Sequence, residues 1–288
     1  MKPEPACCRP GDGGGECMDG KDRRKDWVAR APRTAGLERI EAYFGGRGYE
    51  MHRHDTYAIG RTLSGVQSFH YRRGLRHSLP GGTLVLHPDE AHDGQAGTDA
   101  GFRYRMLYVE PALVQRMLGG QPLPFVPGGL SDDPRLRAAA EPLLRTMSQP
   151  LDPLEEADAL YDLAQALATV AGQRGGRRAF DYGAAERARL RIHDGLAGRL
   201  TLADLEAASG RDRWSLSRDF RALYGVSPYR YATLRRLDVC RRLMLAGQGL
   251  AEAALAAGFT DQSHMSRHFS AAYGMPPGRW LAMLRAGA

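Results

Sequence analysis

The amino-acid sequence predicts an α+β protein of more than one domain, in which a β-barrel or jelly roll with attached helices precedes an all-helical domain. Its 288 residues exceed what one typical core needs. Between residues 49 and 110, short apolar runs alternate with turn signals, whereas from residue 184 onward the pattern is helical throughout. These two regions predict two domains of different structural class.

Four short strands are expected in the first region, over residues 57–63, 66–71, 83–86 and 102–109. Glycine, serine and proline residues stand between them, as turns require. Several short strands at this spacing favour a closed barrel or a double-sheet jelly roll.

Helical periodicity begins near residue 111 and predicts helices over residues 111–118, 133–147 and 153–171. In the third helix, apolar residues recur three and four positions apart, so they form a stripe that either the barrel or a second subunit must cover. The stripe consists of Leu160, Leu163, Ala164, Leu167 and Ala171.

These changes of pattern predict the domain organisation. We expect a disordered tail over residues 1–30, the barrel over 31–120, a helical dimerisation segment over 121–175, a linker over 176–186 and the all-helical domain over 187–288. Helices of the last region are expected over 184–196, 201–209, 213–224, 228–246, 250–257, 262–273 and 277–285.

The positive charge of the chain is concentrated in its last third. The net charge is +7, and residues 184–288 contain 16 arginines, no lysine and nine acidic residues, so the whole excess lies there. Two interpretations remain open: a surface for an anionic partner, nucleic acid rather than membrane, and a solvated arginine-rich face. Because no apolar run is long enough to cross a bilayer, we expect a cytoplasmic protein without a membrane partner.

Three of the four cysteines lie in the glycine-rich tail, which also contains Met18, an alternative start. Cys7, Cys8 and Cys17 have no matching His/Cys spacing downstream, so we expect no metal there. Cys240 falls on the apolar side of a helix and is expected in the core.

A short helical motif occurs twice, as SLSRDFRALYGVSP from Ser215 and as GFTDQSHMSRHFSAAYGMPP from Gly258. Asp212 and Asp261 precede the two helices and are expected to cap them. Apolar residues four positions apart then face inward. These pairs are Leu216 with Phe220 and Met265 with Phe269.

The opposite face of each repeated helix is polar. A short helix precedes each one and ends at Gly210 or Gly258, so each unit is a helix-turn-helix whose second helix fits the DNA major groove. Ser227-Pro228 opens a connecting helix between the units. The outward sets are Arg213, Trp214, Ser217 and Arg218 in the first unit and Gln262, Ser263, Ser266 and Arg267 in the second, with His264 near the edge.

Residues 190–285 resemble the DNA-binding module of AraC family transcription regulators. The resemblance is carried by Ser217-Arg218, Phe220-Arg221, Gly225, Ser227-Pro228, Tyr231, Gly258-Phe259, Asp261-Gln262-Ser263, Ser266-Arg267, Phe269, Gly274, Pro277 and Trp280. It implies that the two units enter successive major grooves of double-stranded promoter DNA. It also implies a homodimer that works with RNA polymerase, more often as an activator than as a repressor.

Arg218 and Arg267 are the best candidates for reading bases, because a guanidinium pairs with O6 and N7 of guanine. A phosphate contact is the alternative for either arginine. Gln262 suits adenine, and Trp214 suits a thymine methyl group. The other basic residues of the region are expected to neutralise phosphates or to lie on plain surface; these are Arg221, Arg235, Arg236 and Arg279.

Residues 40–110 resemble the cupin-type effector domain that precedes many AraC family modules, through EMHRH at residues 50–54, PGG at 80–82 and PDEAH at 88–92. Cupin enzymes hold a metal with such histidines and a glutamate. Since no glutamate follows His54 at the expected spacing, we expect no metal and no other cofactor. The residues expected around a small polar or anionic effector are His52, His54, Tyr57, His92 and Arg105.

The sequence therefore predicts a DNA-binding transcription regulator that a small-molecule effector controls, and not an enzyme. The first alternative is a metal-dependent cupin enzyme with an accessory helical domain. The second is an architectural or RNA-binding protein, for which the basic region would bind without sequence preference.

Overall fold

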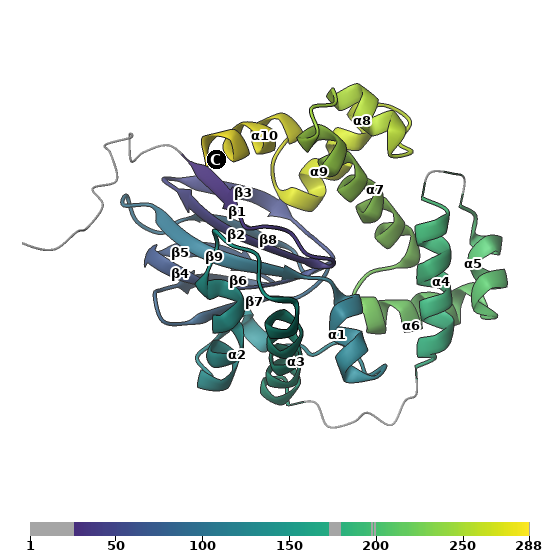
Figure 1. The fold of residues 1–288 in the computed structure, drawn as a ribbon, viewed down its shortest axis with the longest axis horizontal. Coiled ribbons are helices and arrows are strands. Elements are labelled where there is room, and N and C mark those ends of the chain that lie inside the picture. The colour runs from purple at the N-terminus through teal and green to yellow at the C-terminus, as the bar shows by residue number, and fades with distance from the viewer. Residues whose placement is uncertain (1–25, 173–179, 197, 199, 288) are drawn as a thin grey trace, which may run out of the picture.

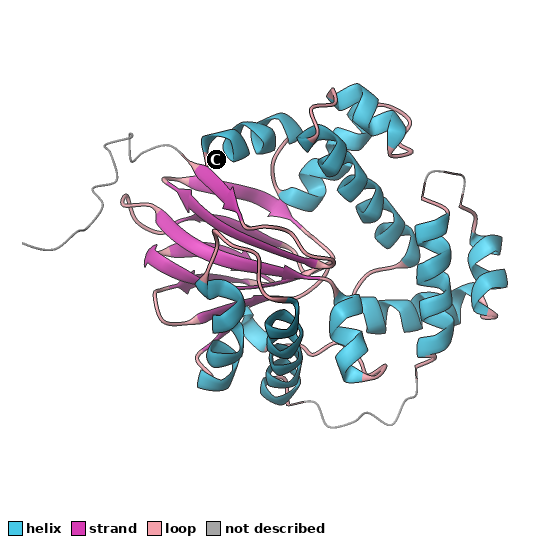
Figure 2. Ribbon diagram, viewed as in Figure 1, coloured by secondary structure: helices cyan, strands magenta, loops and turns pink. Residues whose placement is uncertain are grey.

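The computed structural model describes residues 26–172, 180–196, 198 and 200–287. Strands dominate the first part of the chain, with three helices packed beside them, and the part from residue 180 onward is helical (Figures 1 and 2). The predicted α+β architecture is thus confirmed. Among the described residues, no helix is both long and apolar enough to span a bilayer.

The strands form two antiparallel sheets rather than one closed barrel, as a double-sheet jelly roll does. The six-stranded sheet has the order β1-β2-β9-β4-β7-β10, and the four-stranded sheet has the order β3-β8-β5-β6. The bounds are β1 Trp27–Arg30, β2 Leu37–Phe44, β3 Arg47–His52, β4 Tyr57–Gly65, β5 Gln67–Tyr71, β6 Gly74–Ser78, β7 Thr83–Leu86, β8 His92–Ala96, β9 Phe102–Val109 and β10 Leu130–Ser131.

Three strands lie where the sequence predicted something else. β1 falls within the expected tail, β10 within the expected helical segment, and β8 overlaps the expected loop after residue 94. Each depends on a partner distant in sequence, since β1 pairs with β2, β10 with β7, and β8 with β3 and β5. The HDGQA sequence of β8 has low strand propensity, so pairing rather than local preference makes it a strand.

Helices α1 Pro111–Leu118, α2 Pro134–Arg145 and α3 Pro153–Val170 share a core with the six-stranded sheet. The α3 stripe predicted from sequence is buried there, because Leu160, Leu163, Ala164 and Leu167 are all at most 6% exposed. The described helices of the expected dimerisation segment, α2 and α3, therefore pack against the six-stranded sheet. The opposite face of α3 leaves Leu154 and Tyr161 exposed.

Seven helices follow in the part of the chain that the structure describes, and α4 starts earlier than the sequence predicted. Residues 176–179 of the expected linker lie outside the described residues, and α4 begins at Tyr182 inside the rest of it. Two cores form in this domain, one for each helix-turn-helix unit. The bounds are α4 Tyr182–Asp194, α5 Leu202–Ser209, α6 Arg213–Tyr224, α7 Pro228–Leu245, α8 Leu250–Ala256, α9 Gln262–Tyr273 and α10 Pro277–Ala286.

Three pairs of elements lie side by side between the two domains, and side chains of α7 add ion pairs to the sheet domain. α1 lies beside α6, α9 lies beside β3, and α10 lies along β1, while α7 runs between the two helix-turn-helix units (Figure 1). The all-helical domain therefore wraps around one end and one edge of the sheets. Contacts at both units mean that the sheet domain can influence how the units are placed.

Candidate functional site

The second helices of the two units, α6 and α9, begin at the predicted aspartates. Asp212 accepts hydrogen bonds from the backbone N–H groups of Trp214 and Ser215 at 3.0 and 3.1 Å, and Asp261 accepts one from His264 at 2.7 Å. These carboxylates satisfy amides that have no partner within the helix. Both helix starts predicted from sequence are thus confirmed.

Glu206 on α5 supports the start of α6 in a way that the sequence did not indicate. Its carboxylate accepts a hydrogen bond at 2.8 Å from the backbone N–H of Arg213. The two residues are seven positions apart on different helices, so no local pattern reveals the bond. Glu206 thus fixes the turn of the first unit.

The inward pairs and the outward sets separate as predicted. Leu216, Phe220, Met265 and Phe269 are at most 1% exposed. Of the outward residues, Arg213, Trp214, Arg218, Arg221, Gln262, Ser263 and Arg267 are exposed, and Ser217, His264 and Ser266 are half-buried.

Trp214 is 74% exposed, and the Arg213 guanidinium lies 5.0 Å from the centre of its ring. Exposing so much apolar surface beside a cation is unusual for a residue without a partner. Arg218 forms an ion pair at 3.0 Å with the buried carboxylate of Asp219, which holds its stem in place. The first unit therefore presents an ordered aromatic and cationic surface.

In the second unit, Arg267 is exposed and His264 is internally bonded. His264 Nδ1 lies 3.0 Å from Thr260 Oγ1, and its Nε2 lies 3.0 Å from His268 Nε2. Both ring nitrogens of His264 are thus engaged within the unit. The side chain shapes the surface and offers no free nitrogen in this arrangement.

The prediction that Arg235 contacts phosphate or lies on plain surface is wrong. Arg235 is 7% exposed on α7 and forms ion pairs at 2.8 Å with Asp55 and Glu110, and at 3.0 Å with Asp238. Its partners in the sheet domain are remote in sequence, so helix periodicity could not reveal them. Arg235 joins the two domains.

Two other arginines of that predicted set are also engaged within the protein. Arg236 donates to the backbone carbonyls of Leu196 and Gly198, each at 3.1 Å. Arg279 donates at 3.3 Å to the Asp26 carboxylate beside β1. Arg221 alone of the four has no side-chain partner among the described residues and is exposed on α6.

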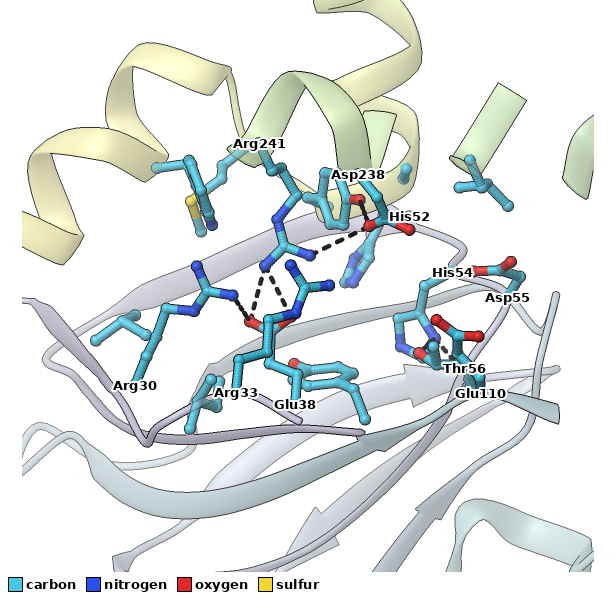
Figure 3. A pocket seen from close by; sticks show the side chains of 18 of the residues that line it. Arg30, Arg33, Glu38, His52, His54, Asp55, Thr56, Glu110, Asp238 and Arg241 are labelled. Carbon is cyan, nitrogen blue, oxygen red and sulfur yellow. Dashed lines mark hydrogen bonds and ion pairs between the residues drawn. The ribbon is translucent and has the colours of Figure 1, made fainter. Parts of the chain in front are cut away.

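A cavity of about 100 Å³ lies between the sheet domain and α7, α9 and α10. Arginines gather in it around one carboxylate: Glu38 forms ion pairs with Arg30 at 2.9 Å and with Arg241 at 2.7 Å (Figure 3). Arg33 stands beside them, exposed (Figure 3). Arg241 also pairs with Asp238 at 3.6 Å, so three cations face two carboxylates at this end of the cavity, which makes it suited to an anion.

The rest of the wall near these arginines is apolar. Its side chains come from β1 and β2 of the sheet domain and from α10 and the segment before it. They are Val28, Ile40, Met275, Trp280, Met283 and Leu284. The cavity therefore combines a cationic end with an apolar wall, as ligand sites with a few oriented polar groups do.

Glu38 remains ionised in this setting. Burial on its own raises the pKa of the carboxyl, but Arg241 and Arg30 outweigh that effect and lower the pKa to about 2. The same carboxylate bonds Arg30 of β1 and Arg241 of α7, so it links the two domains through the cavity wall.

The structure brings together three of the five residues predicted for the effector site. His52, His54 and His92 are buried side by side, and ring centres lie 4.2 Å apart for His52 and His92 and 4.7 Å apart for His54 and His92. Burial lowers the pKa of His92 to about 4, and burial together with the neighbouring imidazoles lowers the pKa of the other two well below 6.5. All three rings are neutral at pH 7.

The other two residues of that prediction lie apart from the three histidines and from the cavity. Tyr57 is fully buried against the helices, and its hydroxyl donates to the Pro124 carbonyl at 2.7 Å. Arg105 bonds the Glu41 carboxylate at 2.7 Å and the Leu144 carbonyl at 3.0 Å. Side chains alternate along a strand, and these two positions face α1 to α3 rather than the cavity.

The sheet domain holds both recognition helices at equivalent positions of the repeat. The carbonyl of Ala222 on α6 accepts a hydrogen bond at 3.1 Å from the Leu123 N–H, and that of Ala271 on α9 accepts one at 3.0 Å from the Arg53 N–H. Each alanine follows the buried phenylalanine of its helix by two residues. The sheet domain thus contacts α6 and α9 at the same point of each.

At Gly274, which ends α9, the backbones of the two domains approach each other closely. The Glu50 N–H donates to the Gly274 carbonyl at 2.9 Å. A Cβ atom at this position would lie 2.7 Å from the Glu50 carbonyl oxygen and 2.7 Å from His52 Nδ1, and φ is +67°. Glycine is therefore required here, because a side chain would collide with these atoms and because the backbone has a positive φ.

A domain with a lined cavity, joined to two helix-turn-helix units, defines a DNA-binding regulator of transcription that a small molecule controls. A model of the AraC-like ligand binding domain matches residues 34–164, and a model of a helix-turn-helix domain matches residues 205–283. The chain belongs to the AraC family of transcription regulators. No curated protein matches the sequence significantly.

Solved structures of ToxT from Vibrio cholerae share the fold over most of both chains. A ligand-free ToxT variant aligns with a TM-score of 0.60 and 12% identity over 88% of this chain and 99% of its own. ToxT with a bound unsaturated fatty acid aligns with a TM-score of 0.60 and 12% identity over 91% of this chain and 95% of its own. The similarity confirms the arrangement of a sheet domain followed by tandem helix-turn-helix units.

Proposed function

We propose that the protein is a cytoplasmic, homodimeric activator of transcription whose effector is an anion with an apolar portion, bound in the cavity between its domains. The observation that carries the proposal is the cavity itself. Its cationic end and apolar wall are built by residues of both domains, and α9 with α10 forms one side of it. A ligand there contacts the ligand-binding domain and the DNA-binding domain at once.

DNA recognition is proposed for the exposed faces of α6 and α9. Arg218 and Arg267 are the proposed base readers, with phosphate contact as the alternative role for each. The remaining members of the surface support them through groove and phosphate contacts. They are Arg213, Trp214, Ser217 and Arg221 on α6 and Gln262, Ser263 and Ser266 on α9, with His264 ordering the start of α9.

The effector chemistry follows from the charges at the cavity. A carboxylate beside Arg33 and Arg241 forms charge-assisted hydrogen bonds, and an apolar chain covers the wall around Trp280. ToxT, which has the same fold, has been solved with an unsaturated fatty acid bound. That observation supports an anionic amphiphile as the class of effector for this chain.

Control of DNA binding is proposed to act through the contacts between domains. An effector shifts a conformational equilibrium only if it binds one arrangement more tightly than another. Because Glu38 bonds both Arg30 and Arg241, an anion that takes over these arginines weakens one link between the domains. The two recognition helices then change their relative placement.

Dimerisation is proposed to use the exposed face of α3, around Leu154 and Tyr161. RNA polymerase is the proposed partner at the promoter.

The test is to measure binding of oleate, and of oleyl alcohol as its neutral counterpart, to the full chain. We expect saturable binding of oleate with at least tenfold preference over the alcohol, because a charge-assisted hydrogen bond contributes about 1.5–3 kcal/mol. The R33Q substitution should weaken oleate binding, and R242Q, an exposed neighbour of Arg241 on α7, should not. Equal affinity for oleate and the alcohol would contradict the anionic effector.

A second measurement links the cavity to DNA. Promoter fragments bound by the chain are selected from genomic DNA, and their affinity is measured with and without oleate. A change in affinity that R33Q abolishes supports control through the cavity. Oleate binding without any change in DNA affinity would separate the cavity from regulation.

A further inference from the structure

Four arginines of the sheet domain surround an open hollow of about 720 Å³. One lies in the segment after β3 and three lie in the hairpin of β5 and β6; they are Arg53, Arg72, Arg73 and Arg76. Residues 1–183 contain 24 basic and 24 acidic residues, so this part of the chain has no overall excess of positive charge. The group of arginines at one hollow is therefore not the consequence of a basic domain.

The two acids that line the hollow are each paired with an arginine. The Glu90 carboxylate lies 2.7 Å from the Arg72 guanidinium, and the Asp89 carboxylate lies 2.8 Å from the guanidinium of Arg230 on α7. The remaining three arginines are exposed, and their guanidinium groups form no hydrogen bond or ion pair with another described residue; they are Arg53, Arg73 and Arg76. Three unpaired guanidinium groups around one hollow create a positive potential that attracts an anion.

The hairpin holds Arg72 in a backbone conformation that an arginine rarely adopts. Its φ is +55°, at the first central position of the two-residue turn between β5 and β6. Glycine, asparagine and aspartate dominate such positions, because other side chains crowd the backbone there. The Glu90 ion pair and the Phe125 ring, whose centre lies 4.0 Å from the guanidinium, hold Arg72 in place. The turn that also carries Arg73 is therefore fixed.

The hollow meets the exposed face of α9 at Arg53. The backbone N–H of Arg53 donates to the Ala271 carbonyl at 3.0 Å. Ala271 is exposed and follows Arg267, the proposed base reader, by four residues, so both lie on the same side of the helix. Arg230, the partner of Asp89, donates to the Arg53 carbonyl at 2.8 Å. Positive side chains thus continue from α9 into the hollow.

His268 on α9 lies within this row of positive charge. Burial lowers the pKa of His268, and the positive charges of His264, Arg230 and Arg267 lower it further. Arg230 and Arg267 therefore lie close enough to act on the same ring. The positive potential of the second recognition helix and that of the sheet domain meet at this point.

We propose that Arg53, Arg73 and Arg76 bind phosphates of the DNA backbone beside the major groove that α9 enters. The ligand-binding domain then forms part of the DNA interface. The inference rests on α9 as a DNA-reading helix, as proposed above, and adds a second domain to that interface. A guanidinium pairs with phosphate oxygens through two parallel hydrogen bonds, and such contacts position a protein on the duplex without reading its sequence.

The form of the hollow favours DNA over a small phosphorylated compound. Its unpaired arginines are exposed, and the row of charge extends beyond it along α9, as a backbone that runs past both requires. A site for a small compound would instead enclose most of its ligand.

The test compares the full chain with R73Q/R76Q on a DNA fragment that the unmodified chain selects from genomic DNA. Affinity is measured at salt concentrations between about 50 and 200 mM, where each phosphate contact contributes about 0.9 to the slope of log affinity against log salt. We expect the double substitution to weaken binding on the order of tenfold, to lower that slope by about 2 and to leave the base preference unchanged. R73K/R76K keeps both charges and should restore most of the affinity.

The matched control is R137Q/R145Q, which removes two exposed arginines from α2 on the six-stranded sheet. It should change neither the affinity nor the salt slope. Circular dichroism and the unfolding midpoint establish that each variant is folded. If R73Q/R76Q does not fold, the single substitutions R53Q, R73Q and R76Q replace it, and each should lower the slope by about 1.

Methylphosphonate linkages, which remove the charge of single phosphates, locate the contact on the DNA. Neutral linkages beside the groove that R267A identifies should weaken binding of the unmodified chain and have no further effect on R73Q/R76Q. Unchanged affinity and slope in folded R73Q/R76Q would overturn the inference and leave DNA reading by α9 intact. An unmodified chain that selects no DNA fragment would overturn both proposals.

ATP serves as the probe for a small phosphorylated ligand. Binding of ATP that R73Q/R76Q abolishes, together with unchanged DNA affinity in that variant, would assign the hollow to such a compound and overturn the DNA contact. Weakened DNA binding in R73Q/R76Q without detectable binding of ATP to the unmodified chain supports the phosphate contact.

Discussion

Arg235 Nη2 lies 2.8 Å from the Asp55 carboxylate, and both side chains are buried between the connecting helix α7 and the ligand-binding domain. Glu110 and Asp238 bond the same guanidinium. Burial, together with Asp238 and Glu110, outweighs Arg235 and raises the pKa of Asp55 to about 6. This cluster, together with the Arg241–Glu38 ion pair, thus anchors the helix that joins the DNA-binding units to the ligand-binding domain.

Replacing Arg235 by methionine should destabilise the protein strongly. The change removes the cation but leaves three carboxylates together, and breaking a buried ion pair in this way costs about 3–5 kcal/mol. Urea unfolding followed by fluorescence measures the loss. R242Q on the exposed side of α7 should change stability by less than about 0.5 kcal/mol. A loss for R235M as small as that of R242Q would show that the cluster does not hold the domains together.

Stability should fall in acid through Glu38, whose pKa is lowered to about 2 from an ordinary value of 4.5. The unfolded chain binds the proton more readily, so the contribution is complete above about pH 4.5 and is lost as the pH falls towards 2. The full difference amounts to ~3 kcal/mol. In E38Q, unfolding free energies measured between pH 5 and pH 3 should decline less than in the unmodified chain. If the unfolding free energies of E38Q and of the unmodified chain declined equally between pH 5 and pH 3, Glu38 would be excluded as a source of acid sensitivity.

The sequence predicted the helices of the DNA-binding domain well because their signals are local. The bounds of α6 and α9 agree with the prediction to the residue, since an aspartate cap, an apolar pair and a final glycine all lie within each helix or next to it. β7 and β9 agree equally well, as apolar runs between turns. Local capping and periodicity thus predict the helices together with β4, β5, β7 and β9, whereas no strand was predicted at β2, β3 or β6.

The junction between the domains could not be predicted, because its interactions join distant parts of the chain. Arg235 and Asp55 are 180 residues apart. On a helical wheel, a buried arginine with acidic partners looks like any basic surface residue. The histidine cluster was recognised from its residues, but the register that places His92 opposite His52 depends on β8, which its own sequence does not predict.

Replacing Arg267 by alanine should relax the preference at one position of the DNA site. A bidentate pair with guanine discriminates against other bases by about 1–3 kcal/mol, so the preferred site should lose about that much while other sequences change little. Binding to a library of randomised sites measures every position at once. R218A provides the same test for the first unit. Equal weakening on all sequences, with a smaller salt dependence, would identify a phosphate contact instead.

Two deletions from the N-terminus should have different effects, because one of them ends before Asp26 and the other removes β1. A chain without residues 1–17 should retain its stability and its DNA affinity, because every described contact of the N-terminal segment begins at Asp26. A chain without residues 1–30 loses β1, which pairs with β2 and lies against α10, and it also loses the Arg30–Glu38 ion pair. We expect this longer deletion to lower the unfolding midpoint and to alter DNA affinity. A large effect of the shorter deletion would show instead that the tail itself acts on DNA binding.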